Sequence, residues 1–504
     1  MTSPSHNDGP WAAIDGHAVA RLNELFAADP DRLSRLSINL GGIYFDWSKT
    51  HLDLDLIEAF EALAEAQGFT AKRDALFSGA IVNHSEGRPA THVAERGQGA
   101  PEDVKAAAAL HQRTRSLVDA IEGGAFGEIH GVLHIGIGGS ALGPELLLDA
   151  LGRDIGNYGV SILSNIDGQA VDDATDPLDP ESTLIVAVSK TFSTAETLMN
   201  VRAAIAWMTE SGVEDPFGRV IAVTANPQAA IDFGIDETRI LPFGEGVGGR
   251  YSLWSSVGFS VALALGWEAF EELLEGAGEM DRHFRLAEPA ANAPLLAAFA
   301  DLTYSQRMGA ETRAVFAYDE RLRLLPSYLQ QLEMESNGKS VTADGQPLDR
   351  PSAPVTWGGT GTDAQHAVFQ LLHQGTHLVP VEFVGVTEAE DGQDPAHHRA
   401  LLLNAFAQGA ALMAGDKSDD GYKNFPGDRP SSTILLDRLD PRTLGALIAF
   451  YEHRTFANAV MLGINPFDQF GVELGKRLAR ELEDPEHREK FDASTRFLIE
   501  KAGL

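Results

Sequence analysis

Short apolar runs rich in β-branched residues recur from about residue 130, and they constrain the fold more than any other feature. The clearest are "GVLHIGIGG", "VSILSNI", "STLIVAVSK" and "RVIAVTA", separated by helical segments. Apolar runs that alternate with helices are typical of parallel strands buried on both faces. A second set, "RAVFAY" and "LVPVEFVG", lies around the helical "AQHAVFQLLHQG". The sequence therefore predicts an α/β fold with two α/β units of related design, built on buried parallel strands.

The remaining segments carry apolar residues at helical spacing. Residues 1–105 are polar, with apolar positions at three- and four-residue steps, and residues 260–310 and the C-terminal part follow the same pattern. A chain of 504 residues is too long for one hydrophobic core. We therefore expect more than one domain, with helical segments at both ends of the chain.

The charge of the chain limits its partners. The formal net charge is −34, and such an acidic surface repels nucleic acid and anionic membranes. It also repels anionic small molecules at long range, so any phosphate site must supply its own local donors. The chain has no Cys, which excludes disulfides, a thiol nucleophile and Cys-based metal sites.

The N-terminal stretch "MTSPSHNDGPWAAIDGHAV" lacks the basic and apolar regions of a signal peptide. No apolar run approaches the roughly 18 residues of a membrane span. We therefore expect a cytoplasmic protein.

A glycine-rich segment, "HIGIGGSALGPELLLDAL" (134–151), follows the first predicted strand, and a helix is expected to begin near Pro144. Glycines allow a ligand to approach the backbone, and a helix N-terminus offers free N–H groups to an anion. The spacing Gly136-x-Gly138-x-x-Ala141 also fits a dinucleotide fingerprint loosely, but the acidic partner comes late, at Asp167. A sugar phosphate, a dinucleotide and a simple tight turn all stay open.

Hydroxyl groups cluster in "AVSKTFSTAETLMN" (187–200), between a predicted strand and a predicted helix. Four hydroxyls and one Lys at a helix N-terminus suit a phosphate monoester. The alternative is a capping box that uses Thr194. The hydroxyls and the Lys exceed what a cap requires, so we favour phosphate. The residues concerned are Ser189, Lys190, Thr191, Ser193 and Thr194.

The segment "GEGVGGRYSLWSSVG" (244–258) places Arg250 directly after Gly248 and Gly249. A guanidinium fixed on a tight turn can stabilise a developing oxyanion better than a mobile ammonium. The alternative is a structural arginine paired with an acidic side chain.

The stretch "QLEMESNGKS" (331–340) holds two carboxylates, Glu333 and Glu335. Most glutamates are solvent-exposed, so each alone is an ordinary surface residue. Residues two apart do not share a helix face, so at most one of them reaches a ligand. A paired-carboxylate site of the glycosidase kind is therefore not expected.

Two further segments carry candidate residues. "GTGTDAQHAVFQLLHQGTH" (359–377) holds His366 at a predicted helix start, and His373 and His377 at a spacing that could share a helix face and bind a metal. "GINPFDQFGVELGK" (463–476) holds Gln469 and Lys476. A structural histidine and a solvated lysine are the alternatives.

Together and in this order, the six segments resemble the glucose-6-phosphate isomerase (phosphoglucose isomerase) family. The motifs are "GIGGSxLGP", "SKTFxTxET", "GGRYSxWSxVG", "MESNGK", "AQHAxxQLxHQG" and "FDQxGVExGK". Similarity extends to "YFDWSKTHLD", "FSGAIVNHSEGRPATHVAER" and "FPGDRPSSTILL" and so covers most of the chain. The acidic composition and Asp363-Ala364, where the family usually has Asn-Gly, depart from the pattern.

The resemblance implies two domains of the sugar-isomerase (SIS) type, each a parallel sheet flanked by helices. A small domain would span 106–278, and a large domain would comprise 279–460 and the N-terminal helical segment 1–105. A helical arm would follow at 461–504. The family is dimeric, so a homodimer is expected in which His366 serves the partner's active site. No metal or other cofactor is implied.

The implied reaction interconverts glucose 6-phosphate and fructose 6-phosphate through a cis-enediol or enediolate. Glu335 matches the base, Arg250 the oxyanion stabiliser, and His366 with Lys476 the ring-opening pair; Glu333 is left without a role. The expected substrate contacts are Gly139, Ser140, Ser189, Lys190, Thr191, Thr194, Gly249, Gln331 and Gln469. Three alternatives remain: a non-catalytic sugar-phosphate sensor, an NAD(P)-dependent enzyme, and an isomerase that also accepts mannose 6-phosphate.

Overall fold

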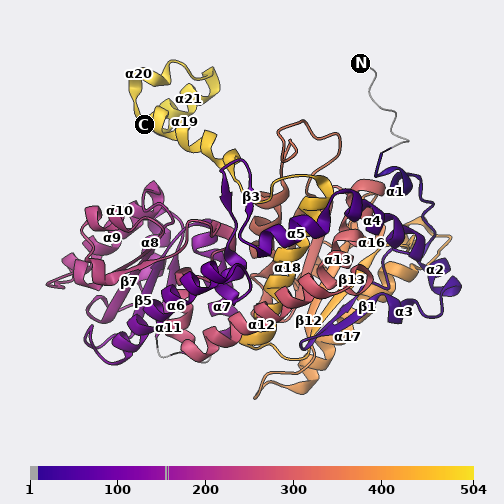
Figure 1. The fold of residues 1–504 in the computed structure, drawn as a ribbon, viewed down its shortest axis with the longest axis horizontal. Coiled ribbons are helices and arrows are strands. Elements are labelled where there is room, and N and C mark those ends of the chain that lie inside the picture. Colours follow the sequence, from indigo (N-terminus) through magenta and orange to yellow (C-terminus); the bar gives the residue numbers. More distant parts are fainter. Residues whose placement is uncertain (1–8, 154–155, 157) are drawn as a thin grey trace. The chain divides into compact units, whose positions relative to one another are not determined.

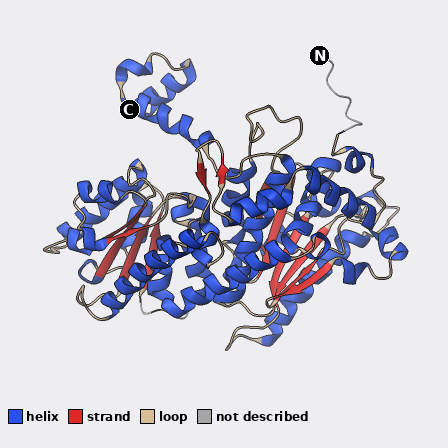
Figure 2. Ribbon diagram, viewed as in Figure 1, coloured by secondary structure: helices blue, strands red, loops and turns tan. Residues whose placement is uncertain are grey.

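The computed structural model describes residues 9–153, 156 and 158–504, so the first eight residues of the N-terminal stretch lie outside the described residues. The described chain up to Pro466 forms one compact unit, and Phe467–Leu504 form a second, which is described by itself. Helices and strands alternate through most of the first unit (Figures 1 and 2).

A five-stranded, entirely parallel sheet occupies the second quarter of the chain (purple in Figure 1). Its strand order is β6-β5-β7-β8-β9, with bounds β5 (Gly131–Ile135), β6 (Gly159–Leu163), β7 (Thr183–Val188), β8 (Val220–Thr224) and β9 (Ile240–Pro242). The four strands predicted here are confirmed. β9 was not predicted because its three residues form too short an apolar run.

Helices cover both faces of this sheet. On one face, Leu133 and Ile185 pack in a common core with Val201 of α9. On the other face, the Ser260 hydroxyl donates to His134 Nδ1 at 2.9 Å, which links β5 to α11. The helices concerned are α6 (Pro101–Glu122), α7 (Leu142–Leu151), α8 (Gly168–Thr175), α9 (Ala195–Glu210), α10 (Pro227–Phe233) and α11 (Phe259–Leu265).

A six-stranded sheet has the order β1-β2-β13-β12-β10-β11. Its strands are β1 (Ser37–Leu40), β2 (Ile43–Asp46), β10 (Thr312–Tyr318), β11 (Val355–Thr360), β12 (Val381–Val386) and β13 (Ser431–Leu436). The last four are parallel, as predicted for β10 and β12, but β1 and β2 run antiparallel. The α/β class with a parallel sheet flanked by helices is therefore confirmed, and the β1–β2 hairpin adds an antiparallel edge that was not predicted.

The antiparallel edge comes from a hairpin within the segment expected to be mainly helical. Leu40 pairs with Ile43 across a two-residue Gly-Gly turn in which both glycines have positive φ. Alternating apolar residues around Gly-Gly are a recognisable hairpin signal. The stretch "INLGGIYF" therefore contained the sequence signal for this hairpin. β2 joins the hairpin to the rest of the sheet by pairing with β13.

The second sheet is also covered on both faces. Phe316 and Phe383 pack against Phe369 and Leu372 on one face. The covering helices there are α15 (Gly361–Ala367), α16 (Phe369–Gln374) and α17 (Pro395–Ala414). On the other face, α13 (Ala293–Leu302) and α18 (Pro441–Leu462) contribute Asp301 and Arg454, which pair with Arg313 of β10 and Glu382 of β12.

Buried charge also joins α18 to α12 (Trp267–Leu286). Arg96 donates to Asp281 through Nε and Nη2, at 2.9 and 2.7 Å, and it also pairs with Glu452. Trp254 Nε1 donates to Glu452 at 2.8 Å, and the Arg96 guanidinium lies 4.8 Å from the Trp254 ring. Burial lowers the pKa of Arg96, but the two carboxylates outweigh it and raise the pKa overall.

The remaining elements of the first unit are α1 (Ala12–Gly16), α2 (Leu22–Ala28), α3 (Arg32–Arg35), α4 (Leu54–Ala66), α5 (Phe69–Phe77), β3 (Ile81–Asn83), β4 (Arg88–Pro89) and α14 (Leu325–Leu329). The second unit contains α19 (Glu473–Glu483), α20 (Pro485–Arg488) and α21 (Ala493–Ala502). Within the described ranges, no helix has both the length and the apolar character needed to cross a membrane.

The contact between α12 and α18 predicts a measurable cost for a single methyl group. A Cβ on Gly445 would lie 2.1 Å from the carbonyl oxygen of Leu273, a backbone atom that cannot move away alone. Gly445→Ala should therefore lower the free energy of unfolding by about 1–3 kcal/mol, as measured by denaturant titration. Gly168→Ala, where the new methyl group meets open space, is the control and should change it by less than about 1 kcal/mol. Equal effects at the two positions would contradict this account of the helix contact.

Candidate active site

The glycine-rich loop after β5 is shaped by contact with another loop. A Cβ on Gly139 would lie 2.2 Å from the carbonyl carbon of Gly249, so only glycine allows the two backbones to meet. Behind the loop, His134 Nε2 donates to the Ser140 carbonyl at 2.7 Å. Burial lowers the pKa of His134 to about 4, so the imidazole is neutral at physiological pH.

This contact weakens the dinucleotide interpretation. Gly139 is explained by the approach of residue 249 of the same chain rather than of a pyrophosphate. The proposed acidic partner, Asp167, is the N-cap of α8 and accepts from the Gln169 N–H at 3.0 Å.

The hydroxyl-rich loop joins β7 to α9. Thr194 occupies the N-cap position of α9, but its side chain makes no capping hydrogen bond. Its hydroxyl lies 3.1 Å from that of Ser189, and the Ser193 hydroxyl donates to Thr191 at 2.8 Å. The capping-box alternative is therefore wrong. The hydroxyls remain close together beside the N-terminus of a 16-residue helix, where an anion is favoured.

Lys190 connects this loop to the loop before Arg250. Its ammonium donates to the carbonyl oxygens of Glu245 and Val247, each at 2.8 Å. Burial, with a contribution from Arg88, lowers the pKa of Lys190 to about 8. The residue is thus a partly desolvated cation within the hydroxyl-rich loop.

Arg250 is buried, with 3% of its surface exposed. Its Nε donates to the Ser336 hydroxyl at 2.6 Å, and Nη2 donates to the Pro466 carbonyl at 2.6 Å. Its Nη1 lies 3.6 Å from Glu335 Oε1. The acidic side chain that Arg250 approaches in this ion pair is the candidate base.

Glu335 ends a π-helical turn, Gln330–Glu335, and keeps 20% of its side chain exposed. Gln331 Nε2 donates to Glu335 Oε2 at 2.8 Å. A Cβ on Gly138 would lie 2.9 Å from that same amide nitrogen, so the glycine-rich loop reaches this turn as well. The two carboxylate oxygens thus face a fixed amide and a buried guanidinium.

Glu333 differs from the uninvolved surface carboxylate that was expected. It is buried, pairs with Arg313, and accepts from the Thr356 hydroxyl at 2.6 Å. The prediction that the two glutamates point in different directions is consistent with these separate partners. The expectation that Glu333 is an ordinary solvated residue is wrong.

The histidines do not form the suggested metal pair. His373 Nε2 lies 2.9 Å from Gln408 Oε1, and α16 ends at Gln374, so His377 does not continue the helix. Over the described residues, no group of three His, Asp or Glu side chains is arranged to hold a metal ion. His366 is exposed on α15.

Gln469 and Lys476 belong to the C-terminal unit. Gln469 precedes a single 3₁₀ turn, and Lys476 on α19 lies 3.3 Å from Glu473 with about half of its side chain exposed. That these two residues join the site stays a prediction.

Two residues that the sequence did not single out contact the site directly. Ser336 accepts from Arg250 and lies 2.9 Å from the Tyr251 hydroxyl. The His92 ring stacks on Tyr251 with centroids 4.7 Å apart. Ser336 and Tyr251 each adjoin a chosen residue, Glu335 or Arg250, so chain proximity was the available signal.

The geometry of these side chains suits the removal of a proton from a carbon atom of a bound ligand. A carboxylate at a solvent-accessible site can remove a proton from carbon, and a buried guanidinium can stabilise the oxyanion that forms. The hydroxyl-rich loop offers an anchor for an anionic group of the same ligand.

Comparisons with known proteins point in the same direction. The family model for phosphoglucose isomerase matches residues 46–499. The glucose-6-phosphate isomerases of Rhizorhabdus wittichii and Sphingopyxis alaskensis are 67% and 64% identical to this chain, and each alignment covers 98% of both chains. A crystal structure of a glucose-6-phosphate isomerase from Chlamydia trachomatis has a TM-score of 0.88 and 31% identity, covering 96% of this chain and 98% of that chain.

Because the Thr194 side chain does not cap α9, a substitution there can distinguish a role in anion binding from a role in helix stability. Thr194→Ala should weaken the binding of inorganic phosphate, measured calorimetrically, and should cost less stability than loss of a true cap. Asp440→Ala is the control, because Asp440 caps α18 by accepting from the Thr443 N–H at 2.8 Å. It should cost about 1 kcal/mol of unfolding free energy. Unchanged phosphate binding together with a stability loss equal to that of the control would restore the capping interpretation.

Proposed function

Because this chain belongs to the phosphoglucose isomerase family, we propose that Glu335 and Arg250 catalyse its isomerisation of glucose 6-phosphate to fructose 6-phosphate and the reverse. The chain is an aldose–ketose isomerase, and glycolysis and gluconeogenesis in the cytoplasm are its proposed setting. The observation that carries the mechanism is the approach of the Glu335 carboxylate to the buried Arg250 guanidinium, at 3.6 Å.

In the proposed central step, Glu335 removes the proton from C2 of the open-chain aldose. The electron pair of that C–H bond forms the C1–C2 double bond, and negative charge develops on the carbonyl oxygen. Arg250 stabilises this charge, and the proton of the C2 hydroxyl passes to the oxygen on C1. The proton held by Glu335 then returns at C1, and the C2 oxygen becomes the carbonyl of the ketose. A C–H bond beside a carbonyl is a weak acid, so both the positioned base and the cationic partner contribute.

The phosphate group is assigned to the hydroxyl-rich loop. The hydroxyls of Ser189, Thr191 and Thr194 and the ammonium of Lys190 supply donors close to the N-terminus of α9. These local donors are required because the net charge of −34 repels the substrate at long range. Ser140 of the glycine-rich loop is assigned to the region of the phosphate as well. The proposed sugar contacts are Gly249, Gln331 and Gln469, and Gly139 is a further proposed substrate contact.

Ring opening is assigned to His366 and Lys476, by resemblance to the family. We propose a homodimer in which His366 completes the active site of the partner subunit, and the exposure of this imidazole on α15 supports that role.

The proposal also divides the chain into domains. They are a small domain at 106–278, a large domain at 279–460 with residues 1–105, and a helical arm at 461–504.

A coupled assay with purified protein and fructose 6-phosphate tests this function. Glu335→Gln keeps the shape of the side chain but removes the base, so kcat should fall by about 10²–10⁴-fold while KM changes little. Near wild-type turnover in the pure variant would refute the role of Glu335.

The same assay with EDTA tests the proposed independence from metal, since activity lost with EDTA and restored by a divalent ion would contradict it. Mannose 6-phosphate as a second substrate measures the breadth of the site.

The pKa of Lys190 predicts the alkaline limb of the pH profile. The ordinary lysine pKa is 10.5, and here it is lowered to about 8, so Lys190 loses its charge as the pH rises through that value. Because the proposed phosphate contact needs the ammonium, kcat/KM should fall above about pH 8. Lys190→Arg should remove this limb, since a guanidinium remains charged there. An unchanged alkaline limb in the variant would assign the titration to another group.

A further inference from the structure

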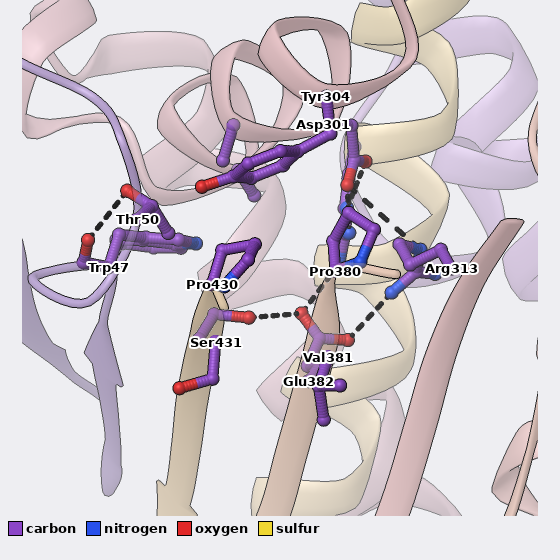
Figure 3. Close-up of a pocket in the computed structure, with 14 residues that line it drawn as sticks. Trp47, Thr50, Asp301, Tyr304, Arg313, Pro380, Val381, Glu382, Pro430 and Ser431 are labelled. Atoms are coloured by element: carbon purple, nitrogen blue, oxygen red, sulfur yellow. Dashed lines mark hydrogen bonds and ion pairs between the residues drawn. The ribbon is translucent and has the colours of Figure 1, made fainter. Parts of the chain in front are cut away.

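Five charged side chains lie together between the six-stranded sheet and the helices α13 and α18, and four of them are buried. Two are arginines and three are carboxylates, namely Arg313 on β10, Arg454 on α18, Asp301 on α13, Glu382 on β12 and Glu333 on the π-helical turn. Figure 3 labels three of them, with Arg313 directed toward both Asp301 and Glu382. The cavity drawn there measures about 20 Å³, room for a single water, so the cluster is closely packed.

Glu333 is the member of this cluster that belongs to the segment carrying Glu335. Its carboxylate accepts from Thr356 at 2.6 Å and pairs with Arg313. Arg313 and Thr356 lie directly opposite each other on the paired strands β10 and β11. One carboxylate therefore fastens the π-helical turn to two neighbouring strands at once.

Other contacts also hold this segment. Gln331, which donates to Glu335, belongs to the same turn and moves with it. Ser336, directly after the turn, accepts from Arg250 Nε at 2.6 Å and so links the segment to the loop that carries Arg250. The bonds of Glu333 link the turn instead to the sheet, and Glu335 lies two residues later, directed toward Arg250.

We propose that Glu333 is a positioning residue for Glu335, an inference that rests on the proposed function. The bonds of Glu333 to Arg313 and Thr356 hold the π-helical turn where the Glu335 carboxylate meets both Arg250 and the substrate carbon. A displacement of about 1 Å at a reacting group can cost about 10²-fold in rate, so this anchor acts on turnover rather than on substrate affinity.

The test compares two isosteric changes in the same buried cluster. Glu333→Gln and Glu382→Gln each replace one carboxylate by an amide, but Glu382 lies on β12 rather than on the π-helical turn. Both variants should lose thermal stability. At a temperature where each is folded by circular dichroism, Glu333→Gln should lower kcat by about 10–100-fold with KM within about threefold. Glu382→Gln should keep kcat within about threefold of wild type.

Thr356→Val provides a milder change, because it removes one donor to Glu333 and leaves all five charges in place. It should lower kcat by about 3–10-fold with KM unchanged. If Glu333→Gln does not fold, Thr356→Val tests the positioning role in its place. Wild-type kcat in both Glu333→Gln and Thr356→Val, or an equal loss of kcat in Glu382→Gln, would overturn the positioning role.

Glu335→Gln, assayed in parallel, separates the two proposals. If it is inactive while Glu333→Gln and Thr356→Val turn over normally, the positioning role alone fails. If Glu335→Gln itself turns over normally, Glu335 is not the base and both proposals fail.

Discussion

An arginine taken out of water must find acceptors for its N–H groups, and this requirement organises the first unit. Arg96 meets Asp281 and Glu452, Arg250 meets Ser336, Pro466 and Glu335, and Arg313 meets Glu333 and Glu382. The acceptors come from helices, strands and loops distant in the sequence. Because an unpaired buried charge is far more costly than a paired one, these contacts tie the elements together in one arrangement.

The three arginines differ in how far solvent or a ligand can reach the carboxylates that pair with them. The carboxylates around Arg96 are enclosed, with no exposed side-chain surface, whereas Glu335 near Arg250 keeps a fifth of its side chain accessible. Arg250 also spends two of its donors on a hydroxyl and a carbonyl, both uncharged. Its ion pair with Glu335 therefore lies at an accessible position, which is what the proposed role of Arg250 toward a bound substrate requires.

Much of the fold was predictable because buried parallel strands leave a plain pattern of β-branched residues. The runs around Val132, Val186 and Ile221 all form strands. β11, with two glycines, and the short β9 lacked that pattern. For the candidate site, the motifs singled out Arg250, Gln331 and Glu335, and the structure brings these three side chains together, while their roles stay predictions. The burial of Glu333 and the uncapped Thr194 were not predictable, because each depends on which neighbour the tertiary fold supplies.

The pairing of β2 with β13 has a consequence for how the chain acquires its structure. Tyr44 pairs with Leu435, so β2, which is synthesised early, can pair with β13 only after most of the chain has been made. The five-stranded sheet, by contrast, is complete once residue 242 has been made. Contacts between distant segments form slowly, because the long intervening loop must close first. The five-stranded sheet can therefore form on the nascent chain, whereas the charged cluster around Arg313 is complete only after Arg454 has been made.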